Sequence, residues 1–190
     1  MEETLVFIDG AYLSLIVKRL FGGATPRFDI KRFSYGLAKE QGLWCRRIFY
    51  YTAPPYLGKS PKEADVKRKA LYDSFVSKLS NERTVTVREG RCQKTSDGFR
   101  QKGVDTLLTM DLMDEPQEAG VKTVIILTCD TDFVPVLERI RSKHGVKVVL
   151  YYFADRVRDS KFSMSNHLLM ACDKKVALNG GHFEECEFVV

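Results

Sequence analysis

The sequence predicts an α/β fold built on a mainly parallel central sheet, and two observations lead to that prediction. Short runs of apolar, mostly β-branched residues are typical of strands buried on both faces of a parallel sheet, and residues 123–127 (TVIIL) are the clearest case. The next segment carries apolar residues at helical spacing, as at Phe133, Leu137 and Ile140. A chain that alternates buried strands with helices is expected to fold around a parallel sheet.

Five apolar runs are expected to form the strands. Most of their residues are valine, isoleucine or aromatic residues, whose side chains fit a pleated surface. Residues 188–190 are also apolar, but this short piece cannot be assigned to a strand or a helix. In chain order, the expected strands are residues 5–8, 48–52, 85–87, 123–127 and 146–153.

Helices are expected between these runs, and local signals mark several of their ends. Gly22-Gly23 ends the first helix, Asp29 caps the second, and Pro135 is tolerated because it lies in the first turn of its helix. Three prolines in residues 53–61 indicate a surface loop. The expected helices are residues 11–20, 28–42, 62–79, a segment that opens at 103, a segment from 133 to about 141, and 165–170.

The composition indicates a single domain, residues 1–190. The chain is 44% hydrophobic and 29% charged, which is ordinary for one globular domain. No apolar stretch approaches the roughly 20 residues that span a bilayer, so no membrane partner is expected. The N-terminus is acidic and lacks the basic start and apolar centre of a signal peptide, so we expect a cytoplasmic protein. The net charge of +5 is too small to identify a partner by itself.

Four aspartates lie where predicted strands are followed by helices or where a helix begins. Asp9 follows the first strand, Asp130 and Asp132 follow the strand at 123–127, and Asp105 lies in the first turn of a helix. We expect these acids to converge, because α/β sheets bind ligands at the carboxyl edge that their strands share. An aspartate at such a junction also serves as a helix cap, but one cap requires only one acid.

Converging carboxylates indicate a site for a divalent cation. Like charges about 4 Å apart repel by roughly 4 kcal/mol at an effective dielectric constant near 20, and a bound cation offsets that repulsion. Mg²⁺ or Mn²⁺ prefers carboxylate and water ligands, and carboxylate-bound Mg²⁺ suits the attack of water on a phosphodiester. The five cysteines form no CxxC pair, which argues against a zinc site and a disulfide framework. The chain also lacks the GxxxxGK[ST], GxGxxG and GxSxG motifs.

Cationic side chains in two segments are candidates for binding a phosphate backbone beside these acids. One segment is the proline-rich loop, which also carries Tyr56, and the other is residues 88–102, expected to form a loop or a hairpin. A plain connector without a binding role remains the alternative for both segments. The RNA-binding candidates are Lys59, Arg88, Arg91, Lys94, Arg100 and Lys102.

Five motifs are spread in order over nearly the whole chain. They are FIDG at 7–10, YY at 50–51, KGVDTLLTMDL at 102–112, TCDTDFVPVLERIRSKHGVKVVLYY at 128–152 and SNHLLMACDKKVAL at 165–178. Together they resemble the NYN domain of the LabA-like group, in the PIN-like ribonuclease superfamily. The resemblance implies a Rossmann-like (PIN-like) three-layer sandwich with an acidic, Mg²⁺-dependent site for cutting RNA.

The resemblance also implies roles for individual acids. Asp9, Asp105 and Asp130 are the implied metal ligands, and Asp132 lies close by as a fourth catalytic acid. Asp111 matches a recurrent family acid with a supporting role, and so does Asp173.

Two positions depart from the family pattern. Tyr12 stands where the family usually has asparagine, and this bulky phenol is expected to reshape the pocket. Thr128-Cys129 stands where the family usually has Ser-Gly, and the threonine keeps the hydroxyl.

The leading hypothesis is a Mg²⁺-dependent (or Mn²⁺-dependent) endoribonuclease. Two alternatives stay open: an RNA-binding module that has lost the chemistry, which Tyr12 favours, and a phosphatase or nucleotide hydrolase that uses the same acids. RNA is the expected partner, although the sequence does not distinguish RNA from DNA and leaves a homodimer open.

Overall fold

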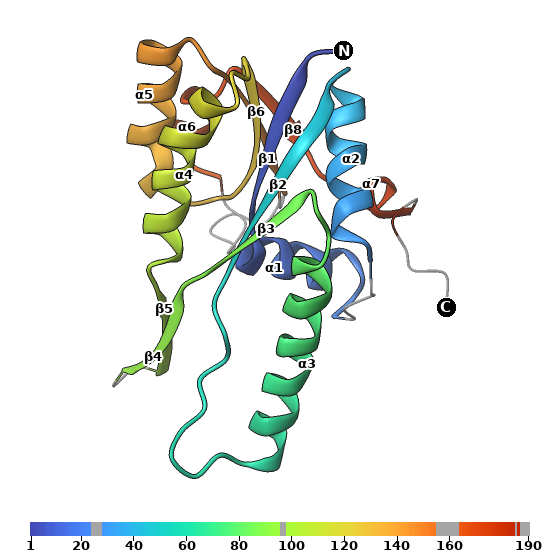
Figure 1. Ribbon diagram of the computed structural model, residues 1–190, viewed down its shortest axis with the longest axis vertical. Coiled ribbons are helices and arrows are strands. Elements are labelled where there is room, and N and C mark those ends of the chain that lie inside the picture. The colour runs from blue at the N-terminus through green and yellow to red at the C-terminus, as the bar shows by residue number, and fades with distance from the viewer. Residues whose placement is uncertain (24–27, 96–97, 155–163, 185, 187–190) are drawn as a thin grey trace.

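A six-stranded parallel sheet forms the centre of the molecule in the computed structural model, which describes residues 1–23, 28–95, 98–154, 164–184 and 186. Its strand order is β3-β2-β1-β6-β7-β8, and every neighbouring pair is parallel. A separate antiparallel hairpin, β4-β5, projects from it (Figure 1). The strands are β1 (Glu3–Asp9), β2 (Trp44–Thr52), β3 (Val85–Glu89), β4 (Arg91–Thr95), β5 (Gly98–Lys102), β6 (Thr123–Leu127), β7 (Lys147–Tyr152) and β8 (Lys174–Ala177).

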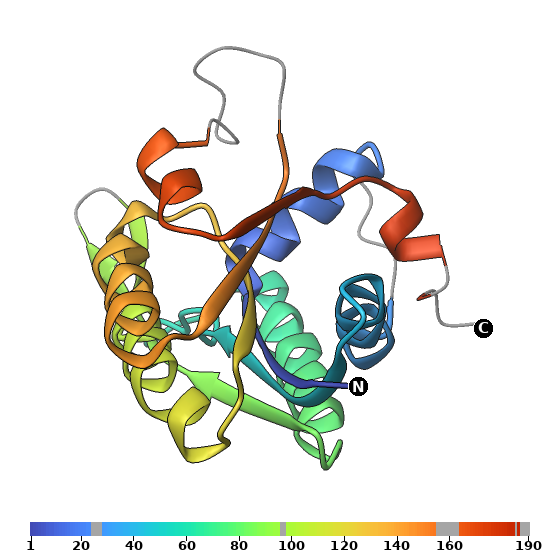
Figure 2. The same cartoon turned by 90° about the horizontal axis from the view of Figure 1, so that it is seen from above.

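Helices cover both faces of the sheet, which makes three layers. Figure 2 shows α1, α2 and α7 on one side of the strands and α4, α5 and α6 on the other. The α/β three-layer architecture with a parallel sheet is therefore confirmed. The helices are α1 (Gly10–Leu20), α2 (Ile30–Glu40), α3 (Glu63–Ser80), α4 (Val104–Glu118), the 3₁₀ turn η1 (Thr131–Phe133), α5 (Val134–His144), α6 (Asn166–Met170) and α7 (Gly181–Glu184).

Two hydrophobic cores, one on each side of the sheet, hold these layers together. Alternate strand residues point to opposite faces, so Val6 and Ile8 of β1 pack in the core with α1 and α2. Leu5 and Phe7 of the same strand pack in the core with α4 and α5. All five residues of β6 are buried, as expected for a central parallel strand. No helix among the described residues is long and apolar enough to cross a bilayer.

The predicted strands and helices are present, and residues 88–102, expected to form a loop or a hairpin, contain the β4-β5 hairpin. The sequence did not predict the edge strand β8 (Lys174–Ala177), which pairs with β7, or the short helix α7. Asp29 caps α2 through its side chain, as predicted, and Ser165 caps α6. Residues 188–190 lie outside the described residues.

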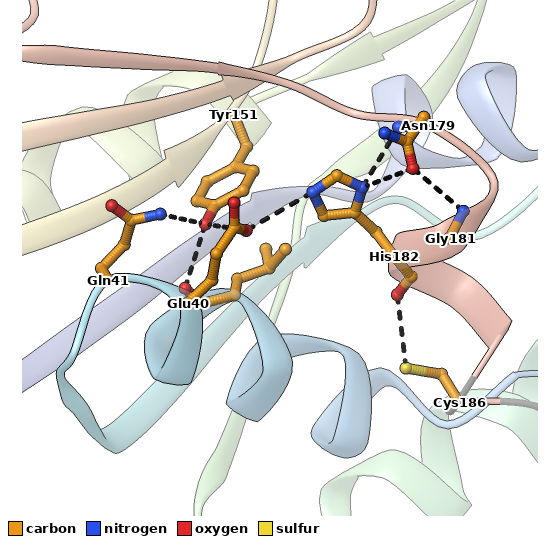
Figure 3. A network of polar contacts seen from close by, with 8 residues as sticks. Glu40, Gln41, Tyr151, Asn179, Gly181, His182 and Cys186 are labelled. Atoms are coloured by element: carbon orange, nitrogen blue, oxygen red, sulfur yellow. Dashed lines mark hydrogen bonds and ion pairs between the residues drawn. The ribbon is translucent and has the colours of Figure 1, made fainter.

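The last described segment is held to the sheet by a polar network (Figure 3). The Tyr151 hydroxyl, at the end of β7, donates to Glu40 Oε2 at 2.7 Å, and His182 Nε2 of α7 lies 3.4 Å from the same oxygen. Asn179 contacts Nδ1 of that histidine. These contacts fasten α7 against α2 and the end of β7.

Candidate active site

The predicted acids gather where the strand order reverses direction. From β1 the chain proceeds to β2 and β3 on one side of the sheet, and then returns to place β6 on the other side of β1. Ile8 and Leu127 are paired residues near the ends of β1 and β6, so Asp9 and Thr128 leave the sheet side by side. Such a switch point at the carboxyl edge is where open α/β sheets bind ligands.

Asp9 ends β1 and caps α1. Its Oδ1 accepts hydrogen bonds from the backbone N–H groups of Ala11 at 3.0 Å and Tyr12 at 3.1 Å. The turn between strand and helix has no room for a side chain at Gly10, where a Cβ atom would lie 2.7 Å from the Tyr50 ring and from a backbone oxygen. The Asp-Gly pair therefore fixes where the carboxylate lies.

Asp130 and Thr128 build the second acidic turn. The Thr128 hydroxyl is fully buried and accepts from the Asp130 N–H at 3.1 Å. Asp130 Oδ1 in turn accepts from the Asp132 N–H at 2.8 Å. Asp9 and Asp130 both use Oδ1 for capping, and in the part of the chain that the structure describes their Oδ2 atoms form no hydrogen bond. Each acid thus serves as a cap and still offers one oxygen to a ligand.

Electrostatic interactions connect all four acids. Burial, followed by the charges of Asp105 and Asp130, raises the pKa of Asp9 above its ordinary value, although its two backbone hydrogen bonds act in the opposite direction. Partial burial and the charges of Asp130 and Asp132 raise the pKa of Asp105. Electrostatic interactions therefore link Asp9, Asp105 and Asp130, which come from the end of β1, the first turn of α4 and the turn after β6, and Asp132 interacts with Asp105.

The donor set suits a hard divalent cation. Among the described residues, no group of three or more histidine, cysteine, aspartate or glutamate side chains is arranged to hold a metal ion directly. Mg²⁺, however, usually retains several waters and binds through one or two carboxylates. Neighbouring carboxylates, two of which keep an oxygen outside their capping hydrogen bonds, fit a cation held partly through water. Asp9, Asp105 and Asp130 are the residues that would hold it.

Asp111 lies apart from this cluster and has its own partner. Its carboxylate, 6% exposed, makes a two-pronged ion pair with Arg88 at 2.7 and 2.8 Å and accepts from the Tyr51 hydroxyl at 2.8 Å. Arg88 therefore ties β3 to α4, which differs from its predicted place among loop cations that contact RNA. Asp173 is likewise paired, with Arg141.

Tyr12 is directed into the protein core. Its ring is 2% exposed, and its hydroxyl accepts from the Phe153 N–H at 2.9 Å. The phenol thus joins α1 to the end of β7, a contact across 141 positions that no local sequence signal reveals. Cys129, the other departure, is half-buried, and burial raises the pKa of its thiol to about 11, which keeps the sulfur neutral near pH 7.

The remaining cationic candidates are exposed, but they do not share one face. Lys94 pairs with Phe99 across the hairpin, and Arg91 pairs with Lys102. Side chains alternate between the two faces of a strand, and an odd number of positions separates Arg91 from Lys94 in β4. The two pairs therefore lie on opposite faces of the hairpin. Within the described ranges, Lys59 and these three hairpin cations form no ion pair with an acid, and the side chain of Arg100 lies outside the described part.

Replacing Asp9 with asparagine is expected to raise Tm in metal-free buffer at pH 7 by about 2–4 °C, the shift for about 1 kcal/mol. Asparagine caps a helix as well as aspartate does, and the change removes one of the repelling charges. Folding raises the pKa of the Asp9 carboxyl, so this group favours the folded state at low pH and lowers the free energy of unfolding as pH rises above 3.8. The gain in Tm from the asparagine variant should therefore shrink on acidification. Calorimetric melts between pH 4 and 8 measure both effects.

The matched control is Asp29→Asn. Asp29 Oδ1 caps α2 by accepting from Lys31 and Arg32 in the same manner, but its ionic neighbour is the guanidinium of Arg32 at 3.8 Å. That variant should show no gain. Equal changes in Tm for both variants at every pH would contradict the proposed repulsion around Asp9.

Comparison with known proteins identifies a family and a fold. The family model described as "NYN domain" matches residues 3–179. A crystal structure of a protein of unknown function from Vibrio parahaemolyticus has the same fold, with a TM-score of 0.62 and 18% sequence identity over 96% of this chain and 95% of that chain. No curated protein sequence matches the chain.

Proposed function

The chain belongs to the NYN domain family, and from that premise we propose that it is a metal-dependent nuclease, most specifically an endoribonuclease that hydrolyses RNA phosphodiester bonds. Membership of this family makes nucleic acid the expected partner. The finer assignment to the LabA-like group is part of the same proposal. A cytoplasmic location and a homodimer stay predictions.

One observation carries the proposal: carboxylates from three separate elements interact at the switch point of a parallel sheet. Asp9, Asp105 and Asp130 are held there although burial and, after it, the charges of neighbouring acids raise the pKa of Asp9 and Asp105. Such an arrangement costs stability, so it favours a role that requires concentrated negative charge. When bound there, Mg²⁺ supplies Lewis-acid stabilisation of a phosphodiester and a nucleophilic water.

The residues themselves have separable tasks. Asp9, Asp105 and Asp130 bind and orient the cation, and the Thr128 hydroxyl holds the turn that carries Asp130. To the exposed Asp132 we assign the role of accepting a proton from the attacking water. Cations of the hairpin bind the phosphate backbone away from the acids.

A panel of labelled substrates tests this function. We expect internal cleavage of a single-stranded RNA with Mg²⁺ or Mn²⁺, and none after addition of EDTA. A DNA of the same sequence and a set of mononucleotides complete the panel. Hydrolysis of mononucleotides with intact RNA would identify a phosphatase or nucleotide hydrolase instead. Retention of RNA without cleavage in any divalent metal would identify a binding module.

A further inference from the structure

An open groove of about 460 Å³ begins directly beside Asp9. Its walls are the first turn of α1, the end of β2 with the loop after it, α3, and the β4-β5 hairpin. Gly10 and Ala11, the two residues after Asp9, line this groove, which places it next to the turn that carries Asp9. In Figure 1, α3 and the hairpin both project past the carboxyl edge of the sheet, on either side of the proline-rich loop.

Aromatic rings dominate the lining. Tyr56 and Phe99 lie with ring centroids 5.3 Å apart, and Tyr50 and Phe75 with centroids 5.6 Å apart. Tyr72 also lines the groove. Phe99 is 61% exposed, and Phe75 is 37% exposed although it lies in the middle of a helix. Aromatic side chains gain most free energy when they are covered, so exposed rings that gather in one groove indicate a flat, apolar ligand.

Cationic side chains near the groove indicate that the ligand also carries negative charge. Arg68 lines the groove, and Lys94 lies beside it as the residue opposite Phe99. A ligand that combines flat rings with negative charge, and whose charge reaches a candidate Mg²⁺ site, is a nucleotide strand. Bases inside a duplex are covered by their neighbours, so only unpaired bases can stack on protein rings.

We propose that this groove binds unpaired bases of a single strand by stacking on Phe99 and Tyr56, and so delivers the adjacent phosphate to the acids at Asp9. The inference rests on the proposed function, because it names the substrate class of the same site. A paired segment would have to open before it entered the groove. Binding by the groove needs no divalent cation, which separates it from cleavage.

Fluorescence anisotropy in EDTA tests the groove without cleavage. The probes are a labelled ten-nucleotide RNA, the same RNA as a blunt duplex, and an abasic strand of equal length. Phe99→Ala should weaken binding of the single strand at least about fivefold, the lower range for loss of one base stack, and leave the abasic strand unaffected. Trp44→Ala is the matched control, because Trp44 is also 61% exposed but lies at the opposite end of β2.

A tryptophan reporter gives a second readout that does not depend on affinity. The chain has a single tryptophan, so the double variant Trp44→Phe with Phe99→Trp carries its only indole in the groove. Its emission should be quenched on addition of single-stranded RNA and remain unchanged with the abasic strand. Equal binding of all three probes, or an unquenched indole at saturation, would overturn the inference.

The two proposals fail in different ways. If the native chain shows no base-dependent binding in EDTA but cleaves RNA with Mg²⁺, the groove proposal is refuted and the nuclease proposal stands. Base-dependent binding without cleavage in any metal would refute the nuclease and leave the groove. Tighter binding of an aromatic peptide than of RNA would assign the groove to a protein partner and refute the inference.

Discussion

The Asp130→Asn variant is expected to lose Mg²⁺-dependent RNA cleavage, with a rate at least about 100-fold below that of the native chain, the scale found when one charge-stabilising group is removed. Asparagine keeps an oxygen that accepts from the Asp132 N–H, so the turn after β6 stays closed. Only the negative charge is removed. Initial rates on a labelled RNA, at matched protein and Mg²⁺ concentrations, measure the effect.

The control for this loss is Asp29→Asn, which makes the same chemical change at a helix cap on α2. Asp29 lies at the start of α2, and its charge is not among the main causes of the raised pKa of Asp9 or of Asp105. Its cleavage rate should equal that of the native chain. Unchanged turnover in Asp130→Asn would remove this acid from the reaction.

The Asp111→Ala variant is expected to be destabilised by about 2–4 kcal/mol, without loss of metal binding. Removing one partner of a buried ion pair costs about 3–5 kcal/mol, and the range here is lower because the Arg88 side chain is 37% exposed. The change also leaves the Tyr51 hydroxyl without its acceptor. Chemical denaturation measures the loss, and the Mg²⁺-induced rise in Tm should persist.

An exposed ion pair provides the comparison. Asp73 pairs with Lys69 on the surface of α3, and the Asp73 side chain is 53% exposed, so Asp73→Ala should cost less than about 1 kcal/mol. A double-mutant cycle with Arg88→Met and Asp111→Leu then isolates the coupling between the buried partners. A cost at Asp111 no larger than at Asp73 would contradict the structural role of this pair.

Local sequence signals were sufficient for five strands of the sheet and for the aspartates that follow β1 and β6. β1 and β6 are short apolar runs, and each leads to an aspartate that also caps the next helical segment. Parallel strands share a carboxyl edge, so placing Asp9 and Asp130 together required only the fold class. β8 was not predictable, because its sequence KKVA lacks an apolar run, and it is an edge strand defined only by its pairing with β7.

Contacts between distant segments determine the features that the sequence did not predict. Asp111 meets Arg88 across 23 positions and Tyr51 across 60, so neither spacing nor periodicity indicates that Arg88 is paired. Phe99 and Tyr56 are isolated aromatic residues in their own segments. They form a groove only because the hairpin and the proline-rich loop meet beside α1.

Calorimetric titration of Mg²⁺ into the native chain and into Asp130→Asn tests the central claim, that carboxylates at the switch point between β1 and β6 bind a divalent cation. The account predicts a saturable isotherm for the native chain that weakens as pH falls toward the raised pKa values of Asp9 and Asp105. It predicts no comparable isotherm for the variant. Superimposable isotherms for the two proteins, or no saturable heat in either, would contradict it.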